Sequence, residues 1–227
     1  VSFTLRRGEI LGFAGLIGSG RTAVMETMVG LQARTSGTIK VNGQPVDFKN
    51  VAESLRAGLV YMTKDRKGKG LLLNIGLQPN LTLLTLYRHM RGGFLMEASE
   101  VEAMERATRR FDIRACDASV RVGQLSGGNQ QKLMLGKAME SDPEIIIIDE
   151  PTRGIDVGTK QQIYHIIAAL AKEGKSIIVV SSEMQEVIGM SHRVVVMREG
   201  RKTGTLEGAE ITEGEIMRYA AGLKREK

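Results

Sequence analysis

The most informative part of the chain reads LSGGNQQ over residues 125–131, and residues 145–151 follow it with IIIIDEP. A serine and two glycines ahead of a helical stretch present several backbone N–H groups, which suit a phosphate ligand. Four isoleucines in a row predict a buried strand, and Asp149 and Glu150 then lie at its carboxyl end. We therefore expect one anion-binding helix tip and one strand end that carries two carboxylates.

A glycine-rich loop lies far upstream, with the sequence GLIGSGRT over residues 15–22. It fits the phosphate-binding loop at every position except Arg21, which stands where the motif has lysine. Its glycines give access to backbone conformations that bring N–H groups close to phosphate oxygens. Arginine keeps the positive charge but is planar, bulkier and forked. We expect Arg21 to support nucleotide binding while placing the γ-phosphate less well.

One glycine loop is weak evidence, and unrelated glycine turns beside a hydrophobic strand are the plain alternative. The three motifs in this order, however, resemble the ATP-binding cassette (ABC) ATPase family, with its Walker A loop, LSGGQ signature and Walker B strand. The resemblance covers nearly the whole chain. It implies an α/β fold: a P-loop NTPase core with a mainly parallel sheet, a small antiparallel β portion and an α-helical signature subdomain. We expect one domain over 1–227, with its core at 1–75 and 139–227 and the helical subdomain at about 76–138.

The resemblance also implies ATP and Mg²⁺ as cofactors and assigns roles to single residues. Thr22 and Asp149 are the expected Mg²⁺ ligands, Asp149 directly or through water. Glu150 is expected to orient or deprotonate the attacking water. The expected nucleotide-binding residues are Gly15, Gly18, Ser19, Gly20, Arg21, Thr22, Ser126, Gly127, Gly128 and Gln130.

Two further positions depart from the family pattern. Lys64 falls where the family has its Q-loop glutamine, and Ser182 falls where it has the switch histidine. Serine donates a hydrogen bond but carries no positive charge near neutral pH. The expected catalytic residues are thus Glu150, Ser182 and Lys64. Asp156 matches the family's D-loop, and a plain helix N-cap is the equal alternative.

The residues that depart from the general family pattern resemble one particular group within the family. GRT at residues 20–22, LSGGNQQK at 125–132 and SSE at 181–183 resemble the carboxyl-terminal half of tandem-cassette ATPases of bacterial monosaccharide importers, the ribose, galactose and xylose class. Lys64 does not follow that pattern. The resemblance implies a degenerate cassette with weak or no hydrolysis of its own, which binds MgATP and supplies its signature in trans.

The same resemblance implies the partners. They are the N-terminal cassette of the same polypeptide or a second copy, transmembrane permease subunits contacted through residues in or near 64–90, and indirectly a periplasmic sugar-binding protein. The expected location is peripheral, at the cytoplasmic face of the inner membrane. Two alternatives stay open: a non-catalytic module that senses nucleotide, and a soluble ABC ATPase of DNA repair or translation. The chain lacks the long coiled-coil or charged insertions of the latter.

Composition narrows the function classes. Lys and Arg number 32 against 26 Asp and Glu, a net charge of +6, but the basic residues are dispersed and tryptophan is absent, so nucleic acid is not expected as a partner. Cys116 is the single cysteine, which excludes an internal disulfide. We expect the three histidines to be surface or packing residues.

No apolar run reaches the length of a membrane span. The chain opens without methionine or a signal pattern, and we expect it to be a fragment that begins after the family's adenine-stacking residue.

Strand and helix patterns alternate along the chain, which predicts a mainly parallel sheet. We expect strands at residues 1–5 and 9–14, and a strand and turn at 38–43. Helical spacing predicts helices over 80–90 and 99–113, the second begun by a capping box of Ser99 and Glu102. After residue 144 the predicted elements are strand 144–149, helix 158–172, strand 176–181, helix 183–190, strand 193–197, strand 201–206 and a last helix capped by Thr212.

Overall fold

The computed structural model describes residues 1–115 and 120–225, so Cys116 lies outside the described residues. The chain divides into two compact units. The first comprises Val1–Tyr61, Glu144–Glu150 and Ile167–Lys227, and the second comprises Met62–Pro143 and Pro151–Ile166. The helical region expected at about 76–138 falls within the second unit.

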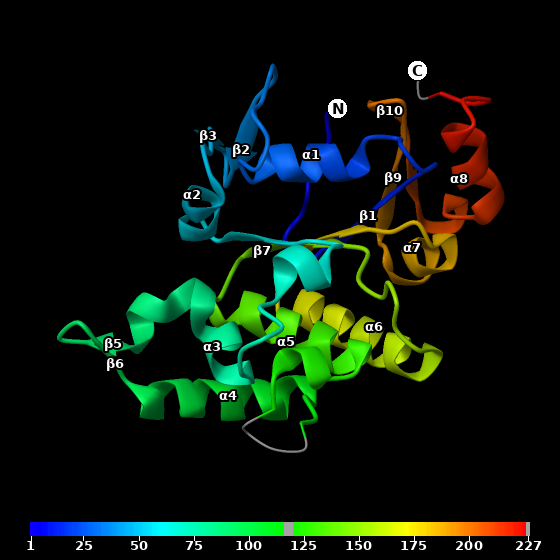
Figure 1. Ribbon diagram of the computed structural model, residues 1–227. Coiled ribbons are helices and arrows are strands. Elements are labelled where there is room, and N and C mark those ends of the chain that lie inside the picture. The colour runs from blue at the N-terminus through cyan, green and yellow to red at the C-terminus, as the bar shows by residue number, and fades with distance from the viewer. Residues whose placement is uncertain (116–119, 226–227) are drawn as a thin grey trace. The chain divides into compact units, whose positions relative to one another are not determined.

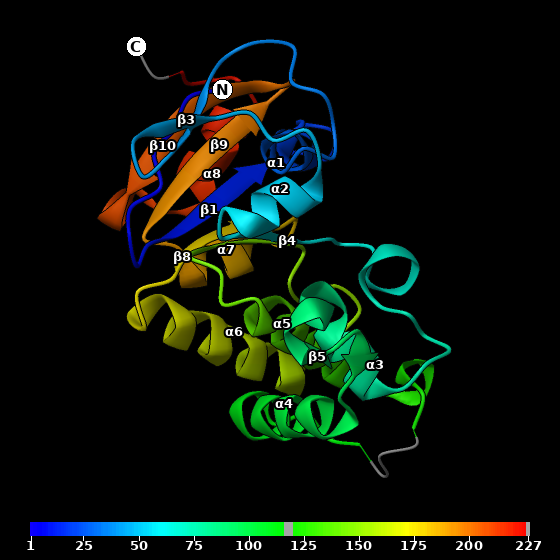
Figure 2. The same ribbon diagram turned by 90° about the vertical axis from the view of Figure 1, so that its left-hand side faces the viewer.

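A six-stranded sheet has the order β10-β9-β1-β8-β7-β4. Strand β1 is parallel to β9, and β10 is antiparallel to β9 (Figure 2). Strand β8 is parallel to both of its neighbours β1 and β7. The predicted mainly parallel sheet with an antiparallel portion is thus confirmed. The bounds are Ile10–Gly15 for β1, Leu59–Met62 for β4, Ile145–Asp149 for β7, Ser176–Val180 for β8, Arg193–Arg198 for β9 and Arg201–Glu207 for β10.

Alternating side chains of β1 and β9 face two separate cores. Phe13 and Val195 belong to a cluster with Met25 of α1 (Arg21–Met28), whereas their neighbours Ala14 and Val194 belong to a cluster on the other face. Helices α7 and α8 cover that second face, and they lie beside each other near β9 (Figure 1). Their bounds are Met184–Met190 and Glu213–Ala220. Period-two apolar patterning therefore buries both faces of the central strands.

Two of the predicted local signals, the turn at Asn42 and Gly43 and the cap at Thr212, are confirmed. Asn42 and Gly43 both have positive φ and join β2 (Ile39–Val41) to β3 (Gln44–Val46) in a tight hairpin. The side chain of Thr212 accepts the N–H of Glu215 over 3.3 Å and caps α8. Helix α2 (Val51–Arg56) is capped in the same way by Asn50.

The core of the second unit is a packing of three helices, α3 (Leu77–Thr82), α4 (Glu97–Phe111) and α5 (Gly127–Glu140) (Figure 1). They meet at Gly136, where an added Cβ would lie 3.1 Å from Leu81 and 3.4 Å from Phe111. Glycine thus lets the helices approach closely. The unit also holds a π-helix at Arg66–Gly70, 3-10 helices at Leu83–His89 and Val122–Gln124, and the short strands β5 (Met90–Arg91) and β6 (Phe94–Leu95). The boundary between the units falls within α6 (Val157–Lys172).

The strand expected at residues 1–5 does not form. Phe3 and Leu5 instead pack on the core of the first unit, where the rings of Phe3 and Phe13 meet edge to face at 5.0 Å. The alternation of apolar residues therefore reflects their packing on the core and does not indicate pairing with another strand.

The helix expected over 80–90 has other bounds, and the expected capping box does not form. The helix predicted over 80–90 begins earlier, since Pro79 lies in the first turn, where no helical N–H is needed. It then tightens to a 3-10 helix that is broken at Thr85. Ser99 and Glu102 form no capping box, because α4 begins at Glu97 and the hydroxyl of Ser99 pairs with Nδ1 of His89 over 2.9 Å.

Within residues 1–115 and 120–225, none of the helices combines the length and the apolar character that a membrane crossing requires.

Candidate functional site

The glycine-rich loop lies between β1 and α1 in the first unit. Gly15, Gly18 and Gly20 all have positive φ, at 151°, 82° and 91°. An added Cβ on Gly15 would lie 2.3 Å from the carbonyl oxygen of Met197, whereas one on Gly18 would meet no atom within 4 Å. Gly20 is the N-cap of α1, and no side chain caps that helix. The start of α1 thus has open space beside it at Gly18, where the end of a helix suits an anion.

A hydrogen-bonded cluster forms beside the loop at the end of β7. The hydroxyl of Thr22 donates to Oδ2 of Asp149 over 2.9 Å, and the hydroxyl of Tyr61 donates to the same oxygen over 3.0 Å. Asp149 is 1% exposed. The structure therefore brings together the two residues expected to hold Mg²⁺. It adds Tyr61, which the sequence analysis missed because nothing local marks a tyrosine in a strand as a partner of Asp149.

Glu150 and Ser182 form a second pair in the first unit. The hydroxyl of Ser182 donates to Oε2 of Glu150 over 2.9 Å. Glu150 has a left-handed backbone, with φ at 53°, and its N–H donates to the carbonyl of Val180 over 2.7 Å. A non-glycine residue in this region costs free energy, which the surrounding contacts must offset. The residue at the switch position is thus held against the expected catalytic carboxylate.

Arg21 points into the protein. Its side chain is buried, and its Nη1 donates to the carbonyl oxygens of Phe13 and Ser181. Burial lowers the pKa of the Arg21 guanidinium, and the negative charges of Glu150 and Asp149, which raise it, offset only part of this effect. The group that replaces the lysine of the motif therefore ties the ends of β1 and β8 together. One nitrogen of the guanidinium reaches both carbonyls, so this end of Arg21 is committed to backbone oxygens.

The first unit suits a triphosphate with its metal. The hydroxyl of Ser19 is buried and has no hydrogen-bond partner among residues 1–115 and 120–225, in a loop that leaves room for an anion at Gly18. Thr22 and Asp149 would hold Mg²⁺, which also takes oxygen ligands from phosphates. Among the described residues, no group of three or more His, Cys, Asp or Glu side chains could hold a metal by itself.

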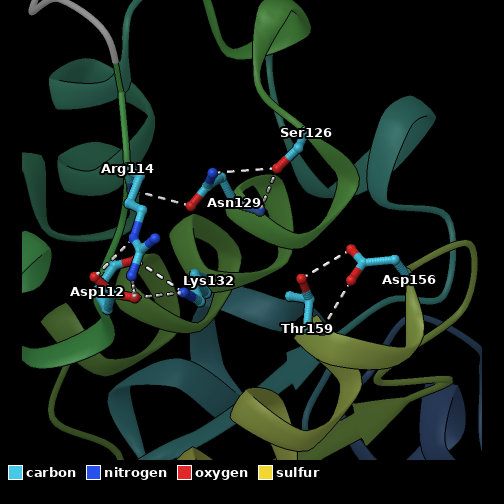
Figure 3. Close-up of polar contacts among 7 residues, drawn as sticks. All are labelled: Asp112, Arg114, Ser126, Asn129, Lys132, Asp156 and Thr159. Carbon is cyan, nitrogen blue, oxygen red and sulfur yellow. Dashed lines mark hydrogen bonds and ion pairs between the residues drawn. The ribbon is translucent and has the colours of Figure 1, made fainter.

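The signature residues belong to the second unit. Ser126 is exposed and caps α5, since its Oγ accepts the N–H of Asn129 over 3.3 Å (Figure 3). Gly127 and Gly128 follow as the first helical residues, and an added Cβ on Gly128 would lie 2.3 Å from the methyl group of Thr159. Small residues are therefore required where the starts of α5 and α6 approach each other.

Gln130 takes a different place from its neighbours in the signature. It is 4% exposed, and its Nε2 donates to the carbonyls of Val122 and Leu125, both at 3.2 Å. Its Oε1 accepts from Nε of Arg66 over 3.2 Å, and Arg66 also donates to Oε1 of Gln131. Both ends of the Gln130 amide thus form hydrogen bonds within the second unit. These bonds hold the turn before the signature residues.

Asp156 acts as the cap of α6. Its Oδ1 accepts the N–H of Thr159 over 2.9 Å and its Oδ2 accepts the hydroxyl of Thr159 over 2.8 Å (Figure 3). These bonds lower the pKa of the Asp156 carboxyl. The N-cap alternative is confirmed.

The last candidates are Lys64 and the three histidines. Lys64 is exposed in the second unit. His165 is exposed, His192 accepts the N–H of Ile10 through Nδ1 over 2.9 Å, and His89 is 4% exposed between helices. The histidines are therefore surface or packing residues, as expected.

Comparison with known proteins bears on this arrangement. A family model described as ABC transporter matches residues 1–153. The chain belongs to the ABC transporter family. Solved structures share the fold: a nucleotide-free ATP-binding cassette from an ABC transporter matches with a TM-score of 0.83 at 18% identity, over 96% of this chain and 87% of that one. The cassette MJ0796, in a post-hydrolysis state bound to ADP and Pi, matches with a TM-score of 0.78 at 19% identity, over 91% and 88%.

Relatives in sequence are much more similar. Ribose import ATP-binding protein RbsA 1 of Rhizobium meliloti (strain 1021) is 43% identical over 224 residues, which cover 99% of this chain and 44% of that protein. Xylose import ATP-binding protein XylG of Geobacillus kaustophilus (strain HTA426) is 44% identical over 225 residues, covering 99% and 45%. This ABC cassette thus spans less than half the length of these relatives.

Proposed function

We propose that this chain is the second, degenerate cassette of the ATP-binding protein of a bacterial monosaccharide importer. It binds MgATP at its glycine loop and supplies residues 125–131 in trans to the nucleotide of a partner cassette. The partner is the N-terminal cassette of the same polypeptide or a second copy of this chain. The relatives named as ribose and xylose import proteins support the sugar class.

The contrast between the two units carries the proposal. In the first unit, Arg21 is committed to two backbone carbonyls and Ser182 is bonded to Glu150. No described side chain at either position is free to bring positive charge to a γ-phosphate. In the second unit, Ser126 is exposed at an intact helix tip. This difference favours donation of the signature over hydrolysis in the chain's own pocket.

Each residue has a defined task in this reaction class. Bound MgATP supplies the γ-phosphoryl group, with the metal balancing its charge. Thr22 and Asp149 hold the metal, and the glycine loop binds the phosphates through backbone N–H groups. Ser126 and the N–H groups at the start of α5 stabilise negative charge on the partner's nucleotide. Loss of one such donor raises the barrier by about 2.7–4 kcal/mol in enzymes that use an oxyanion hole.

Permease subunits are the proposed membrane partners, and they place the protein at the cytoplasmic face of the inner membrane. A periplasmic sugar-binding protein acts on it indirectly. The proposed contact surface is residues 64–90 of the second unit. Exposed apolar side chains support this assignment, because water-exposed apolar groups gather at protein interfaces. They include Leu72, Ile75, Leu83, Leu86, Tyr87 and Met90.

The test is Ser126→Arg in the complete protein that contains this chain, assembled with its permease. The long cation fills the helix tip and removes the serine hydroxyl, so ATP turnover and transport are expected to be abolished. Ser36→Arg places the same side chain on an exposed loop of the first unit and should leave both unchanged. Normal turnover by a folded Ser126→Arg protein would refute donation in trans.

A non-catalytic module that senses nucleotide is the second candidate. The commitment of Arg21 to Phe13 and Ser181 favours it, since nucleotide could then bind without being turned over. The same experiment separates the two. A sensing module predicts that Ser126→Arg leaves ATP turnover intact, whereas the motor predicts its loss.

A further inference from the structure

The hydroxyl of Ser126 is held by two donors from a single residue. Its Oγ accepts the backbone N–H of Asn129 over 3.3 Å and the side-chain Nδ2 of Asn129 over 3.1 Å (Figure 3). A serine hydroxyl has two acceptor lone pairs and one proton to donate. Both lone pairs are therefore occupied from the helix side. The proton remains available for an acceptor outside the helix.

The direction of the Asn129 amide is fixed by a second contact. Its Oδ1 accepts the backbone N–H of Arg114 over 2.9 Å (Figure 3). A backbone N–H only donates, so the amide oxygen must face Arg114 and the NH₂ group must face Ser126. A flipped amide would set two donors against each other at Arg114.

The Arg114 segment is in turn anchored to the same helix. Asp112 ends α4 with a left-handed backbone, and Nζ of Lys132 donates to its carbonyl oxygen over 2.9 Å and contacts its Oδ2 at 3.2 Å. Lys132 is 3% exposed and lies three residues after Asn129 on α5. Hydrogen bonds from Arg114 and Lys132 lower the pKa of the Asp112 carboxyl. One continuous set of contacts therefore leads from Asp112 through the Arg114 N–H and the Asn129 amide to the Ser126 hydroxyl (Figure 3).

We propose that Asn129 is a positioning residue that fixes the Ser126 hydroxyl as a hydrogen-bond donor toward the phosphate of a partner cassette's nucleotide. The inference rests on the proposed function, in which this chain supplies its signature residues in trans. It adds the residue that makes the Ser126 hydroxyl a hydrogen-bond donor toward the partner's nucleotide. Asn129 contacts no nucleotide in this role and acts through Ser126 alone.

The chemistry predicts which substitution reverses the effect. Asn129→Asp keeps an oxygen for the Arg114 N–H, but its second oxygen accepts and takes the Ser126 proton for itself. The hydroxyl then no longer donates outward. The helix should still form, because Asn129 is the third helical residue of α5 and a carboxylate is favourable in the first turn.

The experiment measures kcat and KM for ATP in the complete protein for Ser126→Ala, Asn129→Asp and the double variant. Ser126→Ala and Asn129→Asp should each lower kcat by a similar factor, about 100-fold, with a smaller change in KM. In the Ser126→Ala background, Asn129→Asp should add less than about twofold, because its effect passes through the missing hydroxyl. Asn50→Asp makes the same amide-to-carboxylate change at the cap of α2 and should leave kcat unchanged.

The outcomes separate the inference from the proposed function. If Ser126→Ala lowers kcat and Asn129→Asp does not, the positioning role is wrong and donation by the signature stands. An equal loss from Asn129→Asp with and without Ser126 also overturns the positioning role, since the residue then acts by another route. Unchanged kcat in Ser126→Ala overturns the serine's part in the proposed function, and the positioning role with it.

Discussion

The hydroxyl of Ser182 donates a hydrogen bond to Oε2 of Glu150 over 2.9 Å. The two residues stand at the positions where the family resemblance implies a switch histidine and a catalytic carboxylate. Their pairing holds the carboxylate without bringing any positive charge to it. A histidine in the same place could be protonated and interact with a phosphate, which serine cannot do.

Glu150→Gln is therefore expected to leave ATP turnover by the complete protein within about twofold of the unsubstituted value. The amide still accepts from Ser182, so the local fold is kept while the carboxylate is lost. Steady-state ATPase measurement checks this, with Ser126→Arg as the inactive reference. A large loss of kcat in Glu150→Gln would mean that the chain's own pocket hydrolyses ATP.

Arg21→Ala is expected to lower the free energy of unfolding by about 1–3 kcal/mol. The substitution leaves the carbonyl oxygens of Phe13 and Ser181 without their donor at the ends of β1 and β8. Urea unfolding measures the change. Arg56→Ala on α2 removes an exposed arginine and should cost far less. Equal stability of the two variants would contradict the inward role of Arg21.

Gly128→Ala is expected to destabilise the second unit by about 1–3 kcal/mol, because the new methyl group overlaps the Thr159 side chain. Thr159→Ser removes that methyl group while keeping the hydroxyl bonded to Asp156. The double variant should therefore regain part of the lost stability, as measured by thermal unfolding.

Gly189→Ala is the control for this pair. It lies within α7, and its added Cβ would meet no atom within 4 Å. Alanine there should stabilise the helix by about 0.5–1 kcal/mol. Failure of Thr159→Ser to compensate Gly128→Ala would show that the cost arises from another contact.

Glu9→Gln is expected to have a pH-dependent effect on stability. Burial by itself raises the pKa of Glu9, but hydrogen bonds from Arg193 and from the backbone of Arg6 outweigh it, so the pKa lies below its ordinary value. A carboxyl with a lowered folded pKa stabilises the protein above its unfolded value of about 4.3 and loses that contribution as the pH falls through the folded pKa.

At neutral pH the loss in Glu9→Gln should be about 1.5–3 kcal/mol, since the bond to Arg193 is charge-assisted. The difference from the unsubstituted protein should shrink as the pH is lowered below about 4. Urea unfolding over this range measures it. A difference that stays constant with pH would exclude the Glu9 charge as its cause.

Much of the first unit follows from sequence patterns. The isoleucine run of β7 and the alternation in β1 and β9 predict strands because burial on both faces requires apolar residues. The errors lie where packing overrides local pattern. Phe3 and Leu5 alternate like a strand but pack on the core as irregular chain. Ser99 resembles a cap, yet α4 starts before it and its hydroxyl finds His89.

The residues of the candidate site were likewise predicted only in part from the sequence. The family resemblance implies that Thr22 and Asp149 hold one Mg²⁺, and the structure brings their side chains into contact. Tyr61, Arg66 and Asn129 were not predicted as supporting residues. Tyr61 and Arg66 have their partners in other segments of the chain, so no local pattern marks them. Asn129 bonds Ser126 within its own motif, but the direction of its amide is set by Arg114.

By itself, the sequence determined the family, much of the strand and helix order, and the chemical groups at each motif, because these depend on residue type and short spacing. Only the tertiary structure decided where those groups point. The guanidinium of Arg21 finds the carbonyl of Ser181, 160 residues away, and the amide of Asn129 takes its direction from Arg114, 15 residues earlier. Hydrogen bonding depends on distance and orientation in space, and folding alone brings such remote donors and acceptors together.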